Sequence, residues 1–231
     1  MAAPFYARYA AQFHEPAAAF DDIALQIRLA ANHTYDPATG LFYHGWDEKK
    51  QQGWANKITG TSSNFWGRAM GWYGMALVDV LDYFPTNHPA RPEIITTLRT
   101  LCAGVVKCQD PQSGLWYQVV DQGKRPGNYL EASCSGMFVY TLAKGVNRGY
   151  LPHDFESAAR RGYRGLVEKL VRNDGPGRIS LTQCCAVAGL GQGRDGSYDY
   201  YLHEPVMDND LKGIGPFILS GIELQQLLFP R

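Results

Sequence analysis

The amino-acid sequence predicts an all-α protein built from stacked helical hairpins. Apolar residues recur at helical spacing through most of the 231 residues. Helices with one apolar face alternate along the chain with helices that are apolar nearly all round. A turn motif also recurs between them, which indicates repeated helix pairs. An inner layer of buried helices inside an outer amphipathic layer gives an α/α toroid around a central cavity, and we count about four hairpins in one domain, residues 1–231.

The first element begins almost at the start of the chain. Pro4 suits a first helical turn, and Phe5, Tyr9 and Phe13 share a helix face. No Ser, Thr, Asp or Asn precedes them as a helix cap. We therefore expect the chain to start inside a helix rather than before one.

The helices that follow are of two kinds. Residues 20–31, 94–105 and 155–170 each place apolar side chains on one face and charged ones elsewhere, so each is expected to expose one face to water. Other segments are apolar or small nearly all round and should be buried on every side. These segments are residues 65–84, 130–146 and 214–228.

The linkers carry the repeated motif. Residues 36–43, DPATGLFY, return as residues 110–117, DPQSGLWY. Asp-Pro opens a turn and Gly permits the positive φ that closes it. The aromatic pair that follows predicts a short extended piece before the next buried helix. A third loop, residues 189–201, ends in a similar aromatic way.

Composition and motifs exclude several classes of function. Twenty-two basic residues balance 22 acidic ones, which argues against a nucleic-acid partner. No apolar run is long enough to span a membrane. The five cysteines form no C-x-x-C pair, so neither a disulfide framework nor a zinc site is expected, and we predict no metal and no organic cofactor. The glycines at 189, 191 and 193 do not follow a strand, so they predict no dinucleotide loop.

The candidate site lies between residues 44 and 72. Four of the five tryptophans fall there, together with His44, Asp47, Glu48 and Arg68. Trp66, Arg68 and Trp72 open a buried helix, where the indoles could stack on a sugar ring and Arg68 could grip a carboxylate with two hydrogen bonds.

Structural alternatives stay open for each of these residues. The tryptophans could belong to the core, and Arg68 could pair with a buried acid or with loop carbonyls. His44 could be a hydrogen-bonded structural histidine, and Asp47 could be a turn carboxylate. Convergence on one junction between a loop and a helix favours a site.

Four segments resemble the unsaturated uronyl hydrolases of glycoside hydrolase family 105 and, more distantly, the glucuronyl hydrolases of family 88. They are residues 36–47, 64–72, 129–135 and 212–217. The resemblance covers essentially the whole chain and implies an (α/α)6 toroid of the six-hairpin glycosidase type. It also implies removal of a 4,5-unsaturated uronic acid from the non-reducing end of pectin-derived rhamnogalacturonan oligosaccharides, in the cytoplasm.

The reaction that the resemblance implies is hydration of the C4–C5 double bond. An aspartic acid protonates the vinyl ether, water adds at C5, and the hemiketal opens, so the two-carboxylate displacement scheme does not apply. The family pattern implies that Met1, His44, Trp66, Arg68 and Trp72 bind the substrate, with His44 assisting catalysis.

The match departs from the family at its beginning. The family's proton-donating Asp stands shortly before a Met-x-x-Pro-Phe-Leu motif, and this chain begins at that motif, as Met1-Ala2-Ala3-Pro4-Phe5. The resemblance therefore implies an incomplete toroid that lacks the N-terminal hairpins and the donor. We expect little or no hydrolase activity from this chain alone, and self-association through the open toroid edge.

Two other functions remain open. One is a non-catalytic or degenerate carbohydrate-binding remnant, which keeps Trp66, Arg68 and Trp72 without the acid. The other is a sugar epimerase on the same fold, which would work through paired histidines; His44 shares no motif with the other five histidines.

Overall fold

A computed structural model describes residues 2–229. Its helices are α1 (Ala2–Gln12), α2 (Ala17–Thr34), α3 (Gly67–Leu81), α4 (Arg91–Lys107), α5 (Ala132–Asn147), α6 (Glu156–Gly165), α7 (Tyr198–His203) and α8 (Leu211–Leu228). A 3-10 turn at His153–Phe155 precedes α6, and a π-helical turn at Leu166–Leu170 extends it. The strands are short and form three two-stranded antiparallel pairs, β1 (Tyr35–Asp36) with β2 (Leu41–Phe42), β3 (Val171–Gly175) with β4 (Arg178–Leu181), and β5 (Cys184–Cys185) with β6 (Val206–Met207). No helix within residues 2–229 is long and apolar enough to cross a membrane.

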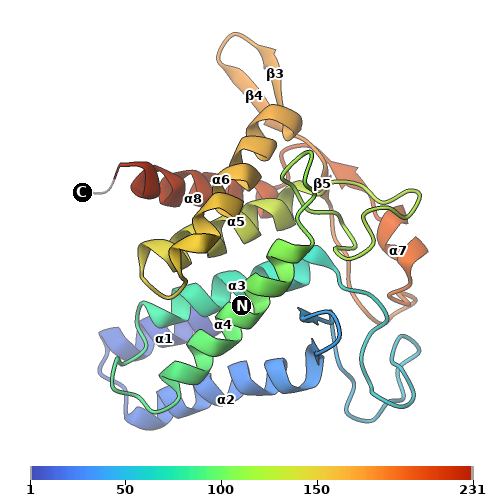
Figure 1. Cartoon of the computed structure of the whole chain (residues 1–231). Coiled ribbons are helices and arrows are strands. Elements are labelled where there is room, and N and C mark those ends of the chain that lie inside the picture. The colour runs from blue at the N-terminus through green and yellow to red at the C-terminus, as the bar shows by residue number, and fades with distance from the viewer. Residues whose placement is uncertain (1, 230–231) are drawn as a thin grey trace.

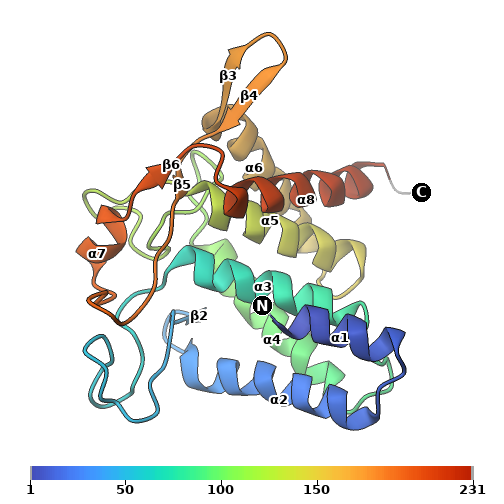
Figure 2. The ribbon, with the colours of Figure 1, turned by 180° about the vertical axis from the view of Figure 1, so that it is seen from behind.

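The helices form two layers. Helices α1, α3, α5 and α8 lie side by side as an inner layer and run in the same direction, while α2, α4 and α6 return along their outer side (Figures 1 and 2). The all-α hairpin prediction is confirmed. We predicted about four hairpins. The described residues form three, α1–α2, α3–α4 and α5–α6, followed by the single inner helix α8.

The α3–α5 pair shows why two of the apolar segments can be buried all round. Every residue of α5 from Ala132 to Val146 is buried, because α3 and α8 flank it and α6 covers it. Three glycines of α3 let the two helices approach. A Cβ atom at Gly67, Gly71 or Gly74 would lie 2.7–2.9 Å from a side-chain atom of α5.

The prediction for residues 214–228 is wrong for one face of α8. Helix α8 packs against α5 and α6, but Leu211, Ile218 and Ile222 are 83%, 55% and 48% exposed, because none of residues 2–229 covers that face. At the other edge of the inner layer, Phe5 of α1 is 74% exposed and Phe13, just after this helix, is 57% exposed. Both edges of the layer therefore carry exposed apolar side chains.

The repeated turns are built alike. In the first, Asp36 Oδ2 accepts hydrogen bonds from the backbone N–H of Thr39, at 3.1 Å, and from its hydroxyl, at 2.6 Å. In the second, Asp110 Oδ2 accepts from the N–H and hydroxyl of Ser113 at 2.7 and 2.6 Å. The glycine that closes each turn has φ near +75°. The sequence repeat is thus a structural repeat.

Each repeated turn also packs against a glycine of the next outer helix. A Cβ atom on Gly104 of α4 would lie 2.2 Å from the carbonyl oxygen of Gly40. A Cβ atom on Gly165 of α6 would lie 2.1 Å from the carbonyl oxygen of Ser113. Both distances are shorter than van der Waals contact, so only glycine fits at these two helix positions.

A buried lysine joins α3 and α5 at the opposite end from their N-termini. Lys144 Nζ lies 2.6 Å from Asp79 Oδ1 and 2.7 Å from Asp82 Oδ2, and the hydroxyl of Tyr140 donates to Asp79 at 2.6 Å. Lys144 is 6% exposed, so the two carboxylates neutralise a charge that would otherwise be buried alone.

The helical pattern failed to predict the β3–β4 hairpin and α7. Pro176 and Gly177 join the two strands in the run NDGPG, residues 173–177, and φ is positive at Gly175 and Gly177. In the strand that follows, Arg178 and Ile179 are exposed while Ser180 and Leu181 are buried. Burial therefore does not alternate along these four residues, and they offer no two-residue period from which a strand could be predicted.

Candidate functional site

The inner helices begin at one end of the molecule. Trp66, Glu131 and Asp210 are the N-cap residues of α3, α5 and α8. Because these helices run in the same direction, their N-termini lie at the same end, where long loops cover them (Figure 2). The positive ends of three helix dipoles meet there, an arrangement that favours an anionic ligand.

Three aromatic residues meet at this end. His44 Nδ1 lies 2.7 Å from the Tyr201 hydroxyl oxygen. The His44 and Trp66 ring centroids are 4.6 Å apart, and those of Trp66 and Tyr201 are 5.9 Å apart. The structure therefore brings two predicted residues together and adds Tyr201, which sequence reasoning missed because it lies on α7.

His44 is held in its neutral form. Burial lowers the pKa of His44 from 6.5 to about 4. At neutral pH its imidazole therefore carries no positive charge and can act as a hydrogen-bond donor or acceptor, but not as an imidazolium acid.

Gln118 links the same residues. Its side-chain oxygen accepts from the indole N–H of Trp66 at 3.1 Å, and its amide nitrogen donates to the backbone carbonyl of Tyr201 at 3.1 Å. Gln118 follows the second repeated turn as His44 follows the first. Sequence reasoning missed it, although extending the repeat by one residue aligns the two.

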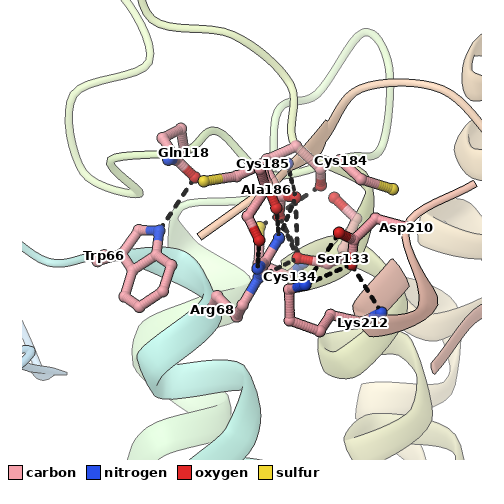
Figure 3. Close-up of polar contacts among 12 residues, drawn as sticks. Trp66, Arg68, Gln118, Ser133, Cys134, Cys184, Cys185, Ala186, Asp210 and Lys212 are labelled. Atoms are coloured by element: carbon pink, nitrogen blue, oxygen red, sulfur yellow. Dashed lines mark hydrogen bonds and ion pairs between the residues drawn. The ribbon is translucent and has the colours of Figure 1, made fainter. Parts of the chain in front are cut away.

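Arg68 is enclosed by protein, with 1% of its surface exposed (Figure 3). Its Nε donates to Ser133 Oγ at 2.7 Å. Its Nη2 donates to the carbonyl of Cys185 and lies 3.4 Å from Glu131 Oε1. Nη1 has one longer bond, 3.3 Å to the carbonyl of Ala186. In this conformation the guanidinium bonds a buried acid and loop carbonyls, which is the structural alternative considered for it.

Glu131 completes a buried network around Arg68. Its carboxylate accepts from the backbone N–H of Cys134 at 2.7 Å and of Cys185 at 2.9 Å, and from the Ser133 hydroxyl at 2.7 and 2.8 Å. Glu131 thus binds the N–H of Cys185 while Arg68 binds its C=O. The sequence contained Glu131 and Ser133 in a family motif, but gave them no role.

The other predicted residues lie elsewhere. Trp72 is partly buried and packs against the main core of the inner helices. Trp46 and Trp54 line a groove beside the site. Asp47 accepts hydrogen bonds from backbone N–H groups of its own turn, chiefly that of Gln52, and these lower its pKa, so it is a turn carboxylate. Met1 lies outside the described residues.

Helices paired in two layers, with loops gathered at the N-terminal ends of the inner layer, define the chain as an α/α-hairpin protein, and its structural neighbours are of the six-hairpin glycosidase type. The model of Glycosyl Hydrolase Family 88 matches residues 1–228, and the chain belongs to this family of glycoside hydrolases. A glycoside hydrolase of family 105 from Clostridium acetobutylicum superposes with a TM-score of 0.94 and 46% identity, over 97% of this chain and 62% of that one.

Two curated relatives differ in extent. The Agrobacterium fabrum protein Atu3128 is 39% identical over 96% of this chain and 97% of its own length. An unsaturated rhamnogalacturonyl hydrolase of Bacillus subtilis is 35% identical over 116 residues, which are 50% of this chain and 30% of that protein. The chain thus spans 62% of the clostridial protein but nearly all of the Agrobacterium one.

Proposed function

We propose that the chain acts on oligosaccharides that begin with a 4,5-unsaturated uronic acid, as released from rhamnogalacturonan, and that it does so in the cytoplasm. The observation that carries the proposal is the meeting of His44, Trp66 and Arg68 at the N-terminal ends of three parallel inner helices. The function of the Bacillus subtilis relative supports the same substrate class.

The proposed binding mode gives each residue a task. The uronate carboxylate lies toward the helix N-termini, whose dipoles favour an anion. Neutral His44, held by Tyr201, bonds a sugar hydroxyl, and Trp66 offers an apolar wall for the ring. Arg68 is 1% exposed, so its Nη1 reaches the carboxylate only if the Ala186 carbonyl, its one acceptor at 3.3 Å, moves aside, while Nε and Nη2 stay bonded to protein. For Trp72 and Met1 the proposed contacts with the sugar rest on the family resemblance alone, because Trp72 packs against the core and Met1 lies outside the described residues.

Hydration of the double bond needs a proton at C4 and a water oxygen at C5, so the site needs a carboxyl that is protonated before the reaction. Three carboxyls near the site, those of Glu131, Asp195 and Asp210, are poorly suited to that task. Glu131 is already bonded to Arg68 and two backbone amides. The backbone N–H of Ser197 lowers the pKa of Asp195. Burial raises the pKa of Asp210, but its bonds to Lys212 outweigh this effect and leave the pKa below its ordinary value.

We therefore propose that these 231 residues alone turn over the substrate slowly and bind it well. A non-catalytic carbohydrate-binding protein is the second candidate function. It is favoured by the same observation, that the carboxyls of Glu131, Asp195 and Asp210 are poorly suited to donate a proton.

The test uses the purified chain and unsaturated galacturonyl-rhamnose. Binding is followed by tryptophan fluorescence, and hydrolysis by loss of the ultraviolet absorbance of the double bond. We expect binding that Arg68→Lys weakens about tenfold, with Arg28→Lys as an exposed control. Full turnover contradicts slow catalysis, and absence of binding contradicts the proposed substrate.

The exposed apolar faces of α1 and α8 support a further part of the proposal, self-association. We expect the sedimentation coefficient to rise with protein concentration. Ile218→Glu, at a position 55% exposed, should reduce that rise. A monomer at every concentration contradicts it.

A further inference from the structure

A groove of about 880 Å³ adjoins the aromatic cluster and has no role in the function proposed above. It lies among the end of α2, β1 and the loop of residues 53–63. Tyr43 lines it, and the next residue, His44, belongs to the cluster. Asp195 also lines it, and a Cβ atom on the next residue, Gly196, would lie 3.7 Å from the Tyr201 hydroxyl oxygen. A ligand held by the cluster can therefore extend into the groove.

The groove wall has a fixed shape. Trp46 stacks on His33 with ring centroids 3.7 Å apart and an 11° angle between the planes. Its indole N–H donates to the carbonyl of Thr59 at 3.1 Å. The side-chain oxygen of Asn56 accepts from the backbone N–H of Ile58 and Thr59 at 2.8 and 3.0 Å. These bonds order the loop before any ligand binds, which lowers the entropy cost of binding.

The lining suits neutral, hydroxyl-rich groups. Hydroxyl and amide side chains alternate with aromatic ones, and Tyr35 is 39% exposed. Asp36 and Asp195 supply negative charge, whereas no Lys or Arg of the described residues lines the groove. The volume lies within the range of small-ligand sites. A second carboxylate or a sulfate placed here would meet like charges without a compensating cation.

We propose that this groove binds the sugars that follow the unsaturated uronate, and that it selects neutral sugars over those carrying a carboxylate or sulfate. Trp54 and Tyr35 supply the aromatic contacts, and Asp195 supplies the charge selection. The inference rests on the proposed function for the position of the uronate, but the groove contacts themselves do not require the double bond or its hydrolysis.

The experiment compares two disaccharides with the same unsaturated galacturonate, one followed by rhamnose and one by a second galacturonate. Calorimetric titration should give about tenfold tighter binding of the rhamnose compound. Tyr35→Ala and Trp54→Phe should each lower the affinity for the rhamnose compound about five- to tenfold. Tyr83→Ala is the matched control, because Tyr83 is 40% exposed and lies near the other end of α3. Asp195→Asn removes a negative charge, so it should raise the affinity for the galacturonate compound only.

The saturated galacturonyl-rhamnose disaccharide separates the two proposals. If it binds with the same dependence on Tyr35 and Trp54 while the unsaturated compound is not hydrolysed, the groove stands and the hydrolase function fails. If the unsaturated compound is hydrolysed but the Tyr35 and Trp54 variants bind like Tyr83→Ala, the groove proposal is overturned. Equal affinity of the wild type for the two unsaturated disaccharides also overturns it.

Discussion

Replacing Glu131 by Gln tests how far the site depends on the buried network. The variant keeps the size of the side chain but removes its charge and one of its two acceptor oxygens. Both oxygens now accept backbone N–H groups, from Cys134 at 2.7 Å and from Cys185 at 2.9 Å. The new NH₂ group must therefore face one of these donors, and Arg68 loses its carboxylate partner.

The expected cost follows from those two losses. An unsatisfied buried N–H costs about 1–3 kcal/mol. Leaving one partner of a buried ion pair alone costs about 3–5 kcal/mol. The two effects share the same atoms and do not add, because Arg68 keeps its bonds to Ser133 and to the carbonyls of Cys185 and Ala186. We expect a loss of about 4 kcal/mol in the free energy of unfolding, or about 8–16 °C in Tm for a chain of this size.

Urea and thermal unfolding measure this loss, with Glu93→Gln as the matched control. Glu93 pairs with Arg28 at 2.9 Å, but the two side chains are 47% and 43% exposed. That variant should unfold close to the wild type, because solvent screens an exposed pair. In the double variant Arg68→Met/Glu131→Gln the loss should be smaller than the sum of the single losses. If the free energies of unfolding of Glu131→Gln and Glu93→Gln differ by less than about 1 kcal/mol, the buried network contributes little to the stability of the fold.

Three further predictions concern other parts of the fold. Burial lowers the folded-state pKa of His44 to about 4, so below pH 6.5 the unfolded chain binds a proton there that the folded chain does not. Between pH 7 and pH 5 the free energy of unfolding of the wild type should therefore fall by about 2 kcal/mol more than that of His44→Gln. Equal shifts of the urea midpoint in the two proteins contradict this. Burial lowers the pKa of Lys144, but bonds to Asp79 and Asp82 outweigh this effect and raise it above 10.5. Lys144→Met should therefore lower the free energy of unfolding by about 1–3 kcal/mol, and by the same amount at pH 6 and pH 9. A difference between wild type and variant that becomes smaller from pH 6 to pH 9 contradicts the pairing. Gly104→Ala should lower Tm by several degrees because its Cβ would meet a backbone carbonyl, whereas Gly53→Ala, with open space, should not; similar melting of the two variants contradicts the turn packing.

The sequence predicted those parts of the fold that rest on local periodicity. Residues 65–84 and 130–146 are apolar over several turns, and they became α3 and α5 with boundaries shifted by a few residues. Helix α7 has six residues, too few for a periodic pattern to emerge. The apolar pattern of α8 alone predicted burial on every side, because it does not tell which neighbours are present. The family resemblance, which implies an open toroid edge, did predict an exposed flank there.

The site was predicted in its residue types more than in its contacts. His44, Trp66 and Arg68 were found from their convergence on one stretch of chain. The buried acid beside Arg68 is 63 residues away along the chain, and the loop carbonyls are more than 110 residues away. Such pairings depend on how helices stack, which local propensity does not encode. Gln118 was within reach, since it occupies in the second turn the place of His44 in the first.

The network and the aromatic cluster are joined through one segment of backbone. Glu131 and Arg68 fix the N–H and C=O of Cys185, and the chain from Ala186 onward leads through Asp195 to Tyr201, which holds His44. A change at Glu131 should therefore reach His44 without touching it. If the loop shifts, His44 becomes more hydrated and its pKa rises toward 6.5 from about 4. NMR titration of His44 in Glu131→Gln measures this directly. An unchanged His44 pKa in a folded variant shows that Tyr201 is positioned independently of Glu131.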